Sequence, residues 1–548
     1  MKGNMRRVLL VLCLVWVLLS ACTTMPSPTL PAASPSSFAT PSASPTPSSS
    51  ATPAESPTPS SATPSETPSA PIEQPSPSLP ADSSPPPTPT PSPSPSLDPD
   101  PGIPSSPAPA IPAETPSPAT PAEEPSASTP TFLATASRQD QDGWIHLVIQ
   151  GDPYQRGLQH GYLLAGEIVA AIQERDALLQ MDMGLTFAEM STLAEEMYGP
   201  MLDPEIRQEM QGIADGAILA GEELSIEEVL GLNSLIDLST MWAIDASGSS
   251  LDDHCSAFIA TGSYTGDGEI VMGHNSWADY AGFDVWRVML DLRPDQGYRM
   301  VMQSAPGLVW SGSDYFITSA GLIGCETTIF NWQRFDPAGL PAFLRTRRAM
   351  QYADSIDGFV EILNDRNNGG YANSWLLGDV RTNEIARFEQ GLAATRLDRT
   401  FDGCYAGYNA AEDPAVQAEA GGWNADDPSN FSGARRIRWS QLLEENKGTL
   451  DAELGMTMLG DHYDTWLETE APSSRTLCGH YEQYGVPCGA MDGKVTTSEM
   501  ARRMSTWARW GLPCGIPFNA ALSIVENPGY AALEGLLSDL PTQPWTQF

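Results

Sequence analysis

Short stretches of strand-like alternation and of helical spacing follow one another from about Arg138 to Phe548. Several strand patterns come in pairs separated by turn residues, which predicts antiparallel sheets. The best-defined pair brackets Thr265-Gly266-Asp267-Gly268. The predicted strands are Ile145–Ile149, Cys255–Ala260, Glu269–Asn275, Val285–Leu290, Tyr298–Met302, Tyr371–Asp379 and Asn383–Glu389.

Helical spacing is clearest in Gly151–Ile172 and Asp203–Ala220. In the first of these, Gly157 and Gly161 share one helical face and predict close packing against a sheet, with His160 beside them as a packed or surface histidine. Pro341–Asn364 is amphipathic and rich in arginine. We expect a surface helix there, with Arg345, Arg347 and Arg348 solvated or paired with acids.

The chain opens with a short export segment. A basic head precedes the apolar run Val8–Leu18, and Leu19-Ser20-Ala21-Cys22 provides a small-residue processing site. The run is too short for a comfortable membrane span. The ending L-S-A-C resembles a bacterial lipoprotein signal, which implies cleavage before Cys22 and lipidation of its sulfur. We therefore expect residues 1–22 to be a signal, and the protein to be extracytoplasmic and anchored to a bacterial membrane by lipid.

Residues 23–137 are dominated by Pro, Ser, Thr and Ala, without an apolar run long enough to bury. Such a composition predicts an extended, disordered tether. The remaining segment, 138–548, is long enough for one large two-layer domain. The whole chain carries 28 Lys and Arg against 68 Asp and Glu, a net charge of −40. This acidity argues against nucleic acid or an anionic surface as the ligand.

One cysteine stands where chemistry is expected. If Gly266 and Asp267 are the central turn residues, Cys255 lies opposite Ala278, give or take two residues. The polar cluster His274-Asn275-Ser276 then returns to the neighbourhood of the Cys255 thiol. The pattern fits either a nucleophilic site or an ordinary buried cysteine.

Three motifs go further than spacing. Cys-Ser-Ala-Phe at 255–258, Gly-His-Asn-Ser-Trp at 273–277 and the segment Cys488–Thr497 resemble the phospholipase B-like proteins, within the N-terminal-nucleophile cysteine hydrolases. The resemblance implies an α+β sandwich of two antiparallel sheets between helical layers. It also implies cleavage between His254 and Cys255. The freed α-amine, which titrates near pH ~8, would serve as base to the thiol.

The same resemblance implies the other site residues. Asn409 is the expected oxyanion donor, and Arg435, with Arg436 as the alternative, steadies the nucleophile. His274, Asn275 and Trp277 are expected to line or order the site. Glu326 and Thr327 fall near the oxyanion position, although Glu326 is equally a structural carboxylate. Asn373 is either a substrate contact or a strand cap.

The expected activity is hydrolysis or transfer of an acyl group, with a small N-acyl amino acid or peptide as first substrate and phospholipid ester as second. Two alternatives remain: a papain-like protease using His462 or His480, and a catalytically silent surface-binding lipoprotein. No metal is expected, because neither histidine has metal-ligand spacing, and no cofactor or nucleic acid is expected. The oligomeric state is left open. Among the cysteines, Cys478 and Cys488 are the preferred disulfide.

Overall fold

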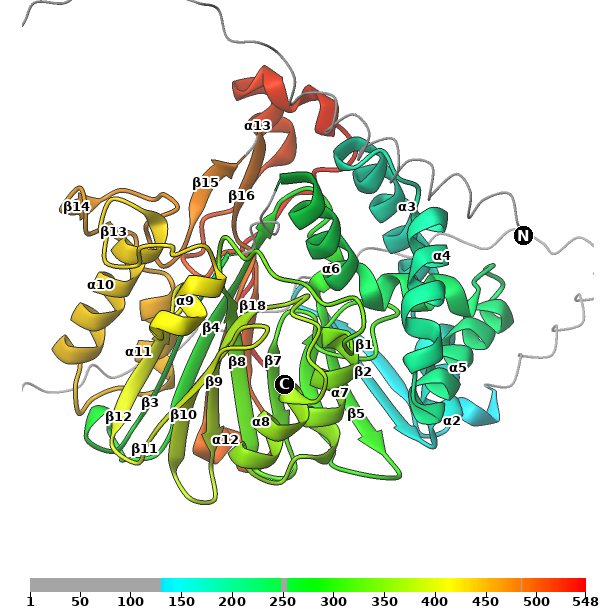
Figure 1. Ribbon diagram of the computed structural model, residues 1–548, viewed down its shortest axis with the longest axis horizontal. Coiled ribbons are helices and arrows are strands. Elements are labelled where there is room, and N and C mark those ends of the chain that lie inside the picture. Colours follow the sequence, from blue (N-terminus) through cyan, green and yellow to red (C-terminus); the bar gives the residue numbers. More distant parts are fainter. Residues whose placement is uncertain (1–129, 248–253, 484) are drawn as a thin grey trace, which may run out of the picture. The chain divides into compact units, whose positions relative to one another are not determined.

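Two β-sheets face each other, and helices cover the outer side of each sheet (Figure 1). This arrangement is seen in a computed structural model that describes residues 130–247, 254–483 and 485–548. The chain therefore folds as a mixed α+β protein whose strands are mostly antiparallel, as the paired strand patterns predict.

The first sheet has nine strands and is antiparallel except between β2 and β5. Its predicted hairpin at 371–389 is confirmed, since β9 pairs with β10 throughout. In spatial order the strands are β1 (Ser137–Gln141), β2 (Trp144–Gly151), β5 (Val288–Pro294), β6 (Met300–Ser304), β7 (Tyr315–Thr318), β8 (Leu322–Thr328), β9 (Asn373–Asp379), β10 (Glu384–Gln390) and β11 (Thr395–Thr400).

The second sheet has eight strands. Both β16 and β17 run along β4, but their registers differ by one residue, so Met491 and its neighbours form a bulge opposite Asn275 and Ser276. The strands are β12 (Gly403–Gly407), β3 (His254–Thr261), β4 (Val271–Asp279), β16 (Val486–Ala490), β15 (His480–Gln483), β17 (Asp492–Thr497), β18 (Trp507–Trp510) and β19 (Thr546–Gln547). A separate pair is formed by β13 (Tyr463–Asp464) and β14 (Thr469–Glu470).

The helices divide between the two outer faces. The face of the first sheet packs against α3 (Ala165–Asp182), α4 (Phe187–Tyr198), α5 (Pro204–Ala220), α6 (Ile226–Ser247), α7 (Ala342–Tyr352) and α8 (Ile356–Asn364). The face of the second packs against α10 (Phe431–Glu445) and α11 (Ala452–Leu459). The remaining helices are α2 (Pro153–Leu163), α9 (Pro414–Glu419), α12 (Ser498–Arg502) and α13 (Ala520–Glu526), with 3-10 turns η1 (Thr131–Leu133), η2 (Gly199–Met201), η3 (Gly262–Tyr264), η4 (Asp284–Trp286) and η5 (Pro528–Leu533).

The core between the sheets follows from strand alternation. Ala257 and Ile259 of β3 meet Ile323 and Cys325 of β8 in this layer, while Phe258 of β3 points to the helices of the other side. Because β3 carries apolar side chains on both faces, this strand of the second sheet is buried between the first sheet and α10 and α11.

The glycine pair of α2 packs against a helix and not against a sheet as the sequence predicted. A Cβ on Gly157 would lie 2.1 Å from the Glu209 carbonyl oxygen, and one on Gly161 would lie 1.9 Å from that of Ile213. Both carbonyls belong to α5. The small residues let the two backbones touch where any side chain would separate them.

The surface position predicted for these arginines is wrong for Arg345 and Arg347, whereas the predicted pairing with acids is confirmed for Arg347 and for Arg348, which lies 2.6 Å from Asp203. Arg345 and Arg347 of α7 are buried, and Arg347 pairs with the equally buried Glu209 of α5 at 2.8 Å. Arg156 of α2 binds the same carboxylate at 2.6 Å. An amphipathic pattern does not distinguish a solvated arginine from one whose charge is met by an acid 138 residues away in the chain.

The predicted signal, the predicted lipidation site Cys22 and most of the predicted tether lie outside the described residues. Within the described ranges, no helix combines the length and apolarity that a membrane crossing requires.

Candidate active site

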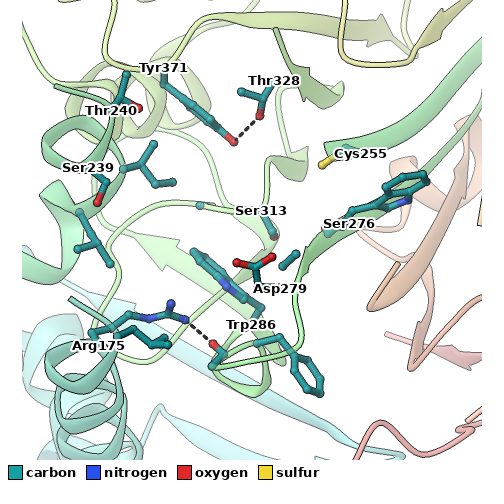
Figure 2. Close-up of a pocket in the computed structure, with 18 of the residues that line it drawn as sticks. Arg175, Ser239, Thr240, Cys255, Ser276, Asp279, Trp286, Ser313, Thr328 and Tyr371 are labelled. Carbon is teal, nitrogen blue, oxygen red and sulfur yellow. Dashed lines mark hydrogen bonds between the residues drawn. The ribbon is translucent and has the colours of Figure 1, made fainter. Parts of the chain in front are cut away.

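Cys255 is the second residue of β3 and lines a cavity of about 300 Å³. Its side chain belongs to a residue that is only 8% exposed. Figure 2 shows the sulfur pointing into the cavity, with Thr328 and Tyr371 on one side and Ser313 and Asp279 on the other. The thiol is therefore shielded from bulk solvent but faces an internal space.

The strand partner of Cys255 is Ser276 and not Ala278. The register differs by two residues from the central prediction because β3 ends at Thr261 and residues 262–270 form a longer connection that includes η3. Ser276 therefore lies directly across from the thiol, on the same face of the sheet.

Asn275 is not placed at the thiol. Alternation along β4 turns it to the opposite face, where its amide nitrogen donates to the carbonyl oxygens of Leu459 at 2.9 Å and Leu477 at 3.0 Å. Asn275 therefore does not line the site, and its contacts instead tie β4 to the segments behind it.

His274 shares the face of Ser276 but does not line the cavity. Its Nε2 lies 2.9 Å from the backbone oxygen of Glu326, so Nε2 carries the hydrogen and donates. The ring stacks on Tyr315 with centroids 6.3 Å apart. Burial, helped by nearby Lys494, lowers the pKa of His274 well below its ordinary value. This neutral histidine orders the inter-sheet layer and is not positioned as a base.

Asn409 and Arg435 converge on the backbone of Cys255. The Cys255 nitrogen donates to Asn409 Oδ1 at 2.9 Å, and Arg435 donates to the same oxygen at 2.8 Å. Arg435 also donates to the Cys255 carbonyl oxygen at 2.5 Å. Asn409 has a φ of 64°, a left-handed conformation that is uncommon outside glycine and is often found at functional sites.

Arg435 is fully buried, and desolvation lowers its pKa to about 9. Its guanidinium lies 4.5 Å from the centroid of the Trp277 ring, so the predicted Trp277 supports this cation as well as lining the cavity. The alternative, Arg436, pairs with Glu412 and Asp426 at the surface. The structure thus separates the two arginines and brings Arg435 to Cys255.

A carboxyl pair stands across the cavity. The Tyr371 hydroxyl lies 2.6 Å from Asp314 Oδ2 and 2.9 Å from Glu326 Oε1. Burial raises the pKa of Asp314. With its amide nitrogen turned toward the pair, Asn373 donates to Glu326 Oε2 at 2.7 Å. Asn373 does not line the cavity itself, but it contacts a cavity residue and begins β9.

Thr327 does not line the cavity. Alternation along β8 points Glu326 and Thr328 toward it and turns Thr327 away, against Gly407 of β12, where a Cβ would lie 2.6 Å from the Thr327 methyl. The Thr328 carbonyl oxygen accepts from Asn409 Nδ2 at 2.8 Å, which joins β8 to the Cys255 side of the site.

Sequence reasoning missed a buried lysine. Lys494 Nζ donates to Ser276 Oγ and Asp492 Oδ1 at 2.7 Å each, and to Gln303 Oε1 at 2.5 Å. Burial lowers the pKa of Lys494 despite the Asp492 charge. The segment Cys488–Thr497 contained this signal, but only the fold places Lys494 behind Ser276. The β-bulge at Met491 lies beside this contact.

Polar and apolar side chains line the cavity together. Ser276 and Tyr371 lie near the Cys255 thiol, and Asp314 and Glu326 also line the cavity. Side chains from α3, α6 and the 281–286 segment provide an apolar contribution, Leu178, Leu179, Met181, Leu235, Ile236, Phe283 and Trp286, beside the polar Arg175, Asp182, Ser239 and Thr240. The arrangement can hold an acyl group with its carbonyl near the thiol and its chain along the helices.

The predicted disulfide is wrong. Cys478 and Cys488 do not form a disulfide with each other, and Cys488 Sγ donates to Asp279 Oδ1 at 2.7 Å. Cys478 instead lies 3.5 Å from His480 Nε2, and His480 lies 3.0 Å from His462. These histidines are thus engaged with each other and with a second thiol, which removes the support for a papain-like site. The two histidines gather in space with Cys478 and Cys514, although neither has metal-ligand spacing along the chain.

Known proteins resemble this chain over the part that builds the cavity. Residues 141–395 match the family model for phospholipase B. A phospholipase-B 81 from Drysdalia coronoides is 26% identical over 317 residues, 52% of this chain and 56% of the relative. Phospholipase B from Crotalus adamanteus is 28% identical over 45% of this chain and 42% of its own length. An uncharacterized protein of Archaeoglobus fulgidus is 30% identical over 40% of this chain and 39% of its own.

The chain thus spans between about two fifths and somewhat over half of the length of these relatives. The matched residues contain Cys255, the strands β3 to β10 and both carboxyls of the cavity, whereas Asn409, Arg435 and Lys494 lie beyond residue 395. Over this segment, the chain is similar to the phospholipase B-like family.

Proposed function

We propose that this protein is an acyl hydrolase whose nucleophile, Cys255, becomes an N-terminal residue by cleavage of the His254–Cys255 bond. The observation that carries the proposal is the double hold on Cys255. Its nitrogen donates to Asn409 Oδ1 at 2.9 Å and its carbonyl oxygen accepts from Arg435 at 2.5 Å, while its side chain lines the cavity. After cleavage that nitrogen would be an α-amine, held next to its own thiol.

In the proposed reaction the α-amine takes the thiol proton and the sulfur attacks the acyl carbonyl, forming a thioester. The alcohol or amine leaves with the proton from the ammonium. Water, activated by the same amine, then hydrolyses the thioester and restores the thiol.

Two groups are suited to the oxyanion. Asn409 Nδ2 donates to the Thr328 carbonyl oxygen at 2.8 Å beside Cys255, and an amide donor at the oxyanion position typically contributes ~3 kcal/mol to transition-state stabilisation. Ser276 Oγ accepts from Lys494, so its own hydrogen is directed away from the ammonium, and the residue lines the cavity next to Cys255.

The preferred substrate is a phospholipid ester. The names of the Drysdalia and Crotalus relatives point to that class, and the apolar side chains of α3 and α6 suit a fatty acyl chain. A second candidate is an N-acyl amino acid or peptide. It is favoured by the acids that line the cavity, Asp279, Asp314 and Glu326, because carboxylates near the thiol repel a phosphate group.

The finer assignment to the N-terminal-nucleophile cysteine hydrolases belongs to the same proposal. It is supported by the two stacked sheets with helices on both sides and by the position of Cys255 at the start of a strand. Export and lipidation at Cys22 are proposed with it, on the sequence alone.

The test begins with a denaturing gel and N-terminal sequencing of the purified mature protein. We expect a chain that starts at Cys255. Processed protein is then assayed on phosphatidylcholine vesicles and on a panel of N-acyl amino acids, and mass spectrometry of stalled reactions should find acyl on Cys255.

The Cys255→Ala variant should remain uncut and inactive, with kcat at least about a thousandfold lower. Cys404→Ala is the matched control, because Cys404 lies on the neighbouring strand β12 and does not line the cavity. Turnover retained in Cys255→Ala would refute the site. An intact chain with no acyl-enzyme and no turnover would favour the silent binder.

A further inference from the structure

Four metal-binding side chains gather at a second place in the molecule. They are His462, Cys478, His480 and Cys514, and their ligand atoms all lie within 4.8 Å of one another. They come from three segments: the residues before β13, those at the start of β15 and those after β18. Cys478 is buried and the other three are half-buried.

The distances suit one small ion. His480 Nε2 lies 3.5 Å from Cys478 Sγ, 3.5 Å from Cys514 Sγ and 3.0 Å from His462 Nε2. In a tetrahedral zinc site, bonds of ~2.3 Å to sulfur and ~2.0 Å to nitrogen place neighbouring ligand atoms about 3.3–3.8 Å apart. The four side chains therefore already stand at nearly the separations that coordination requires.

We propose that these four residues bind a structural Zn²⁺ ion. Two thiolates and two imidazoles are a ligand set that zinc prefers, and the thiolate charges balance that of the ion. With four protein ligands the coordination is complete, so the ion has no open position for a substrate.

The surroundings are built to hold the ligands. The Ile516 nitrogen donates to Cys514 Sγ at 3.4 Å, as backbone groups around zinc-bound thiolates do. The Cys478 nitrogen donates to the oxygen of Asp461, the residue before His462, at 3.1 Å. At Gly460 a Cβ would lie 3.2 Å from the Cys514 Cα, so a glycine lets the two segments approach.

The ion would fasten the layer behind the active site. Asn275 of β4 donates to Leu459 and Leu477, close in sequence to His462 and Cys478. Gly479, between Cys478 and His480, packs on Trp277, where a Cβ would lie 2.5 Å from the ring. Trp277 in turn supports Arg435. Zinc at this place would stabilise the support of the site without taking part in the chemistry.

The test measures metal on the full mature protein, purified without chelators from zinc-supplemented cells. Elemental analysis should find one zinc per chain. Replacement by Co²⁺ should give the intense visible bands of tetrahedral S₂N₂ coordination. Removal of the metal by 1,10-phenanthroline should lower the melting temperature, and added Zn²⁺ should restore it.

Cys514→Ser and His480→Gln should each lower the bound zinc at least about tenfold, because a ligand is lost. Cys404→Ser is the control and should keep its zinc, since Cys404 is a half-buried cysteine outside the cluster. The readout is metal content, so it is independent of whether Cys255 is catalytic.

Measurements on the unmodified protein test the proposal even if a variant fails to fold. A protein whose cysteines are all reduced and that holds neither zinc nor Co²⁺ would overturn the proposal. So would mass-spectrometric detection of a Cys478–Cys514 disulfide in freshly isolated protein that remains metal-free after reduction and addition of zinc.

Discussion

Arg435 and its neighbour Arg436 point to different sides of α10, and Arg435 is the one that contacts Cys255. Its guanidinium donates to the Cys255 carbonyl oxygen, to Asn409 Oδ1 and to Ser256 Oγ. A lysine ammonium cannot span these acceptors, because it is a point charge and not a planar fork. Arg435→Lys should therefore lower kcat about a hundredfold with little change in KM.

Steady-state kinetics of the processed protein checks this prediction. Arg436→Lys is the matched control, since Arg436 is the next residue and its partners, Glu412 and Asp426, lie at the surface. We expect it to stay within about twofold of the parent enzyme. Equal losses in both variants would mean that α10 as a whole, and not the Arg435 fork, sets the activity.

His160 links acidity to stability. It is buried on α2, and its Nε2 accepts a hydrogen bond from the Gly307 nitrogen at 2.9 Å. Burial lowers its pKa to about 4, with Arg347 adding to the shift and Glu209 opposing it. Between about pH 6.5 and pH 4, His160 is therefore protonated in the unfolded chain but neutral in the folded chain. The free energy of unfolding decreases as the pH falls through this range.

In the His160→Gln variant that loss should disappear. Between pH 7 and pH 4, the stability advantage of the parent over the variant should shrink by about 3 kcal/mol. Urea unfolding at several pH values measures the free energy of unfolding of both proteins. Because both contain the same acidic residues, the contribution of these residues cancels in the difference. If the free energies of unfolding of the two proteins changed with pH in parallel, the pKa of His160 would be the same in the folded and the unfolded chain, and the prediction would be wrong.

At the scale of elements, α2 and α5 are joined by backbone contact. A Cβ on Gly161 would stand 1.9 Å from the Ile213 carbonyl oxygen, so Gly161→Ala must push the helices apart and should cost at least about 2 kcal/mol. Gly166→Ala in α3 is the control. A Cβ there meets nothing within 4 Å, and alanine should stabilise the helix by up to about 1 kcal/mol.

Thermal unfolding monitored by circular dichroism should thus move the two melting temperatures in opposite directions. A neutral Gly161→Ala would mean that α2 sits on α5 less tightly than the carbonyl contact indicates.

The strands around the thiol could be predicted because alternation is a local property. The hairpin β9–β10 lies within two residues of its predicted bounds, and Cys255 was placed within two residues of its partner. Faces were harder. His274 and Asn275 stand next to each other, and only the true register shows that neither side chain lines the cavity.

The contacts that could not be predicted join elements that are far apart in the sequence. Lys494 reaches Ser276 across 218 residues, and Asp314 meets Tyr371 across 57. The cluster of His462, Cys478, His480 and Cys514 has no ligand spacing along the chain, because its members are brought together by loops at the ends of different strands. Spacing rules find sites that one short segment builds, and these sites are not of that kind.

For the molecule as a whole, the proposed cut at 254–255 would leave two chains with one core. The first chain supplies β2, which pairs with β5 of the second, and the helices α3 to α6 share a cluster with α7 and α8. Buried Glu209 of the first chain binds Arg347 of the second at 2.8 Å. We expect the two chains to elute together in size-exclusion chromatography and to separate only in denaturant.

Uncut Cys255→Ala protein is the reference and should elute at the same volume. Release of the smaller chain from processed protein under native conditions would contradict the shared core.

The contacts on the Cys255 backbone also determine when, during synthesis of the chain, self-cleavage can begin. The groups that hold its nitrogen and its carbonyl come from Asn409 and Arg435, which lie 154 and 180 residues further along the chain. A ribosome that has just completed the Cys255 codon has not yet made either of them. If self-cleavage requires these contacts, it can occur only after most of the polypeptide has been synthesised. An unfinished chain would therefore be protected from premature cleavage.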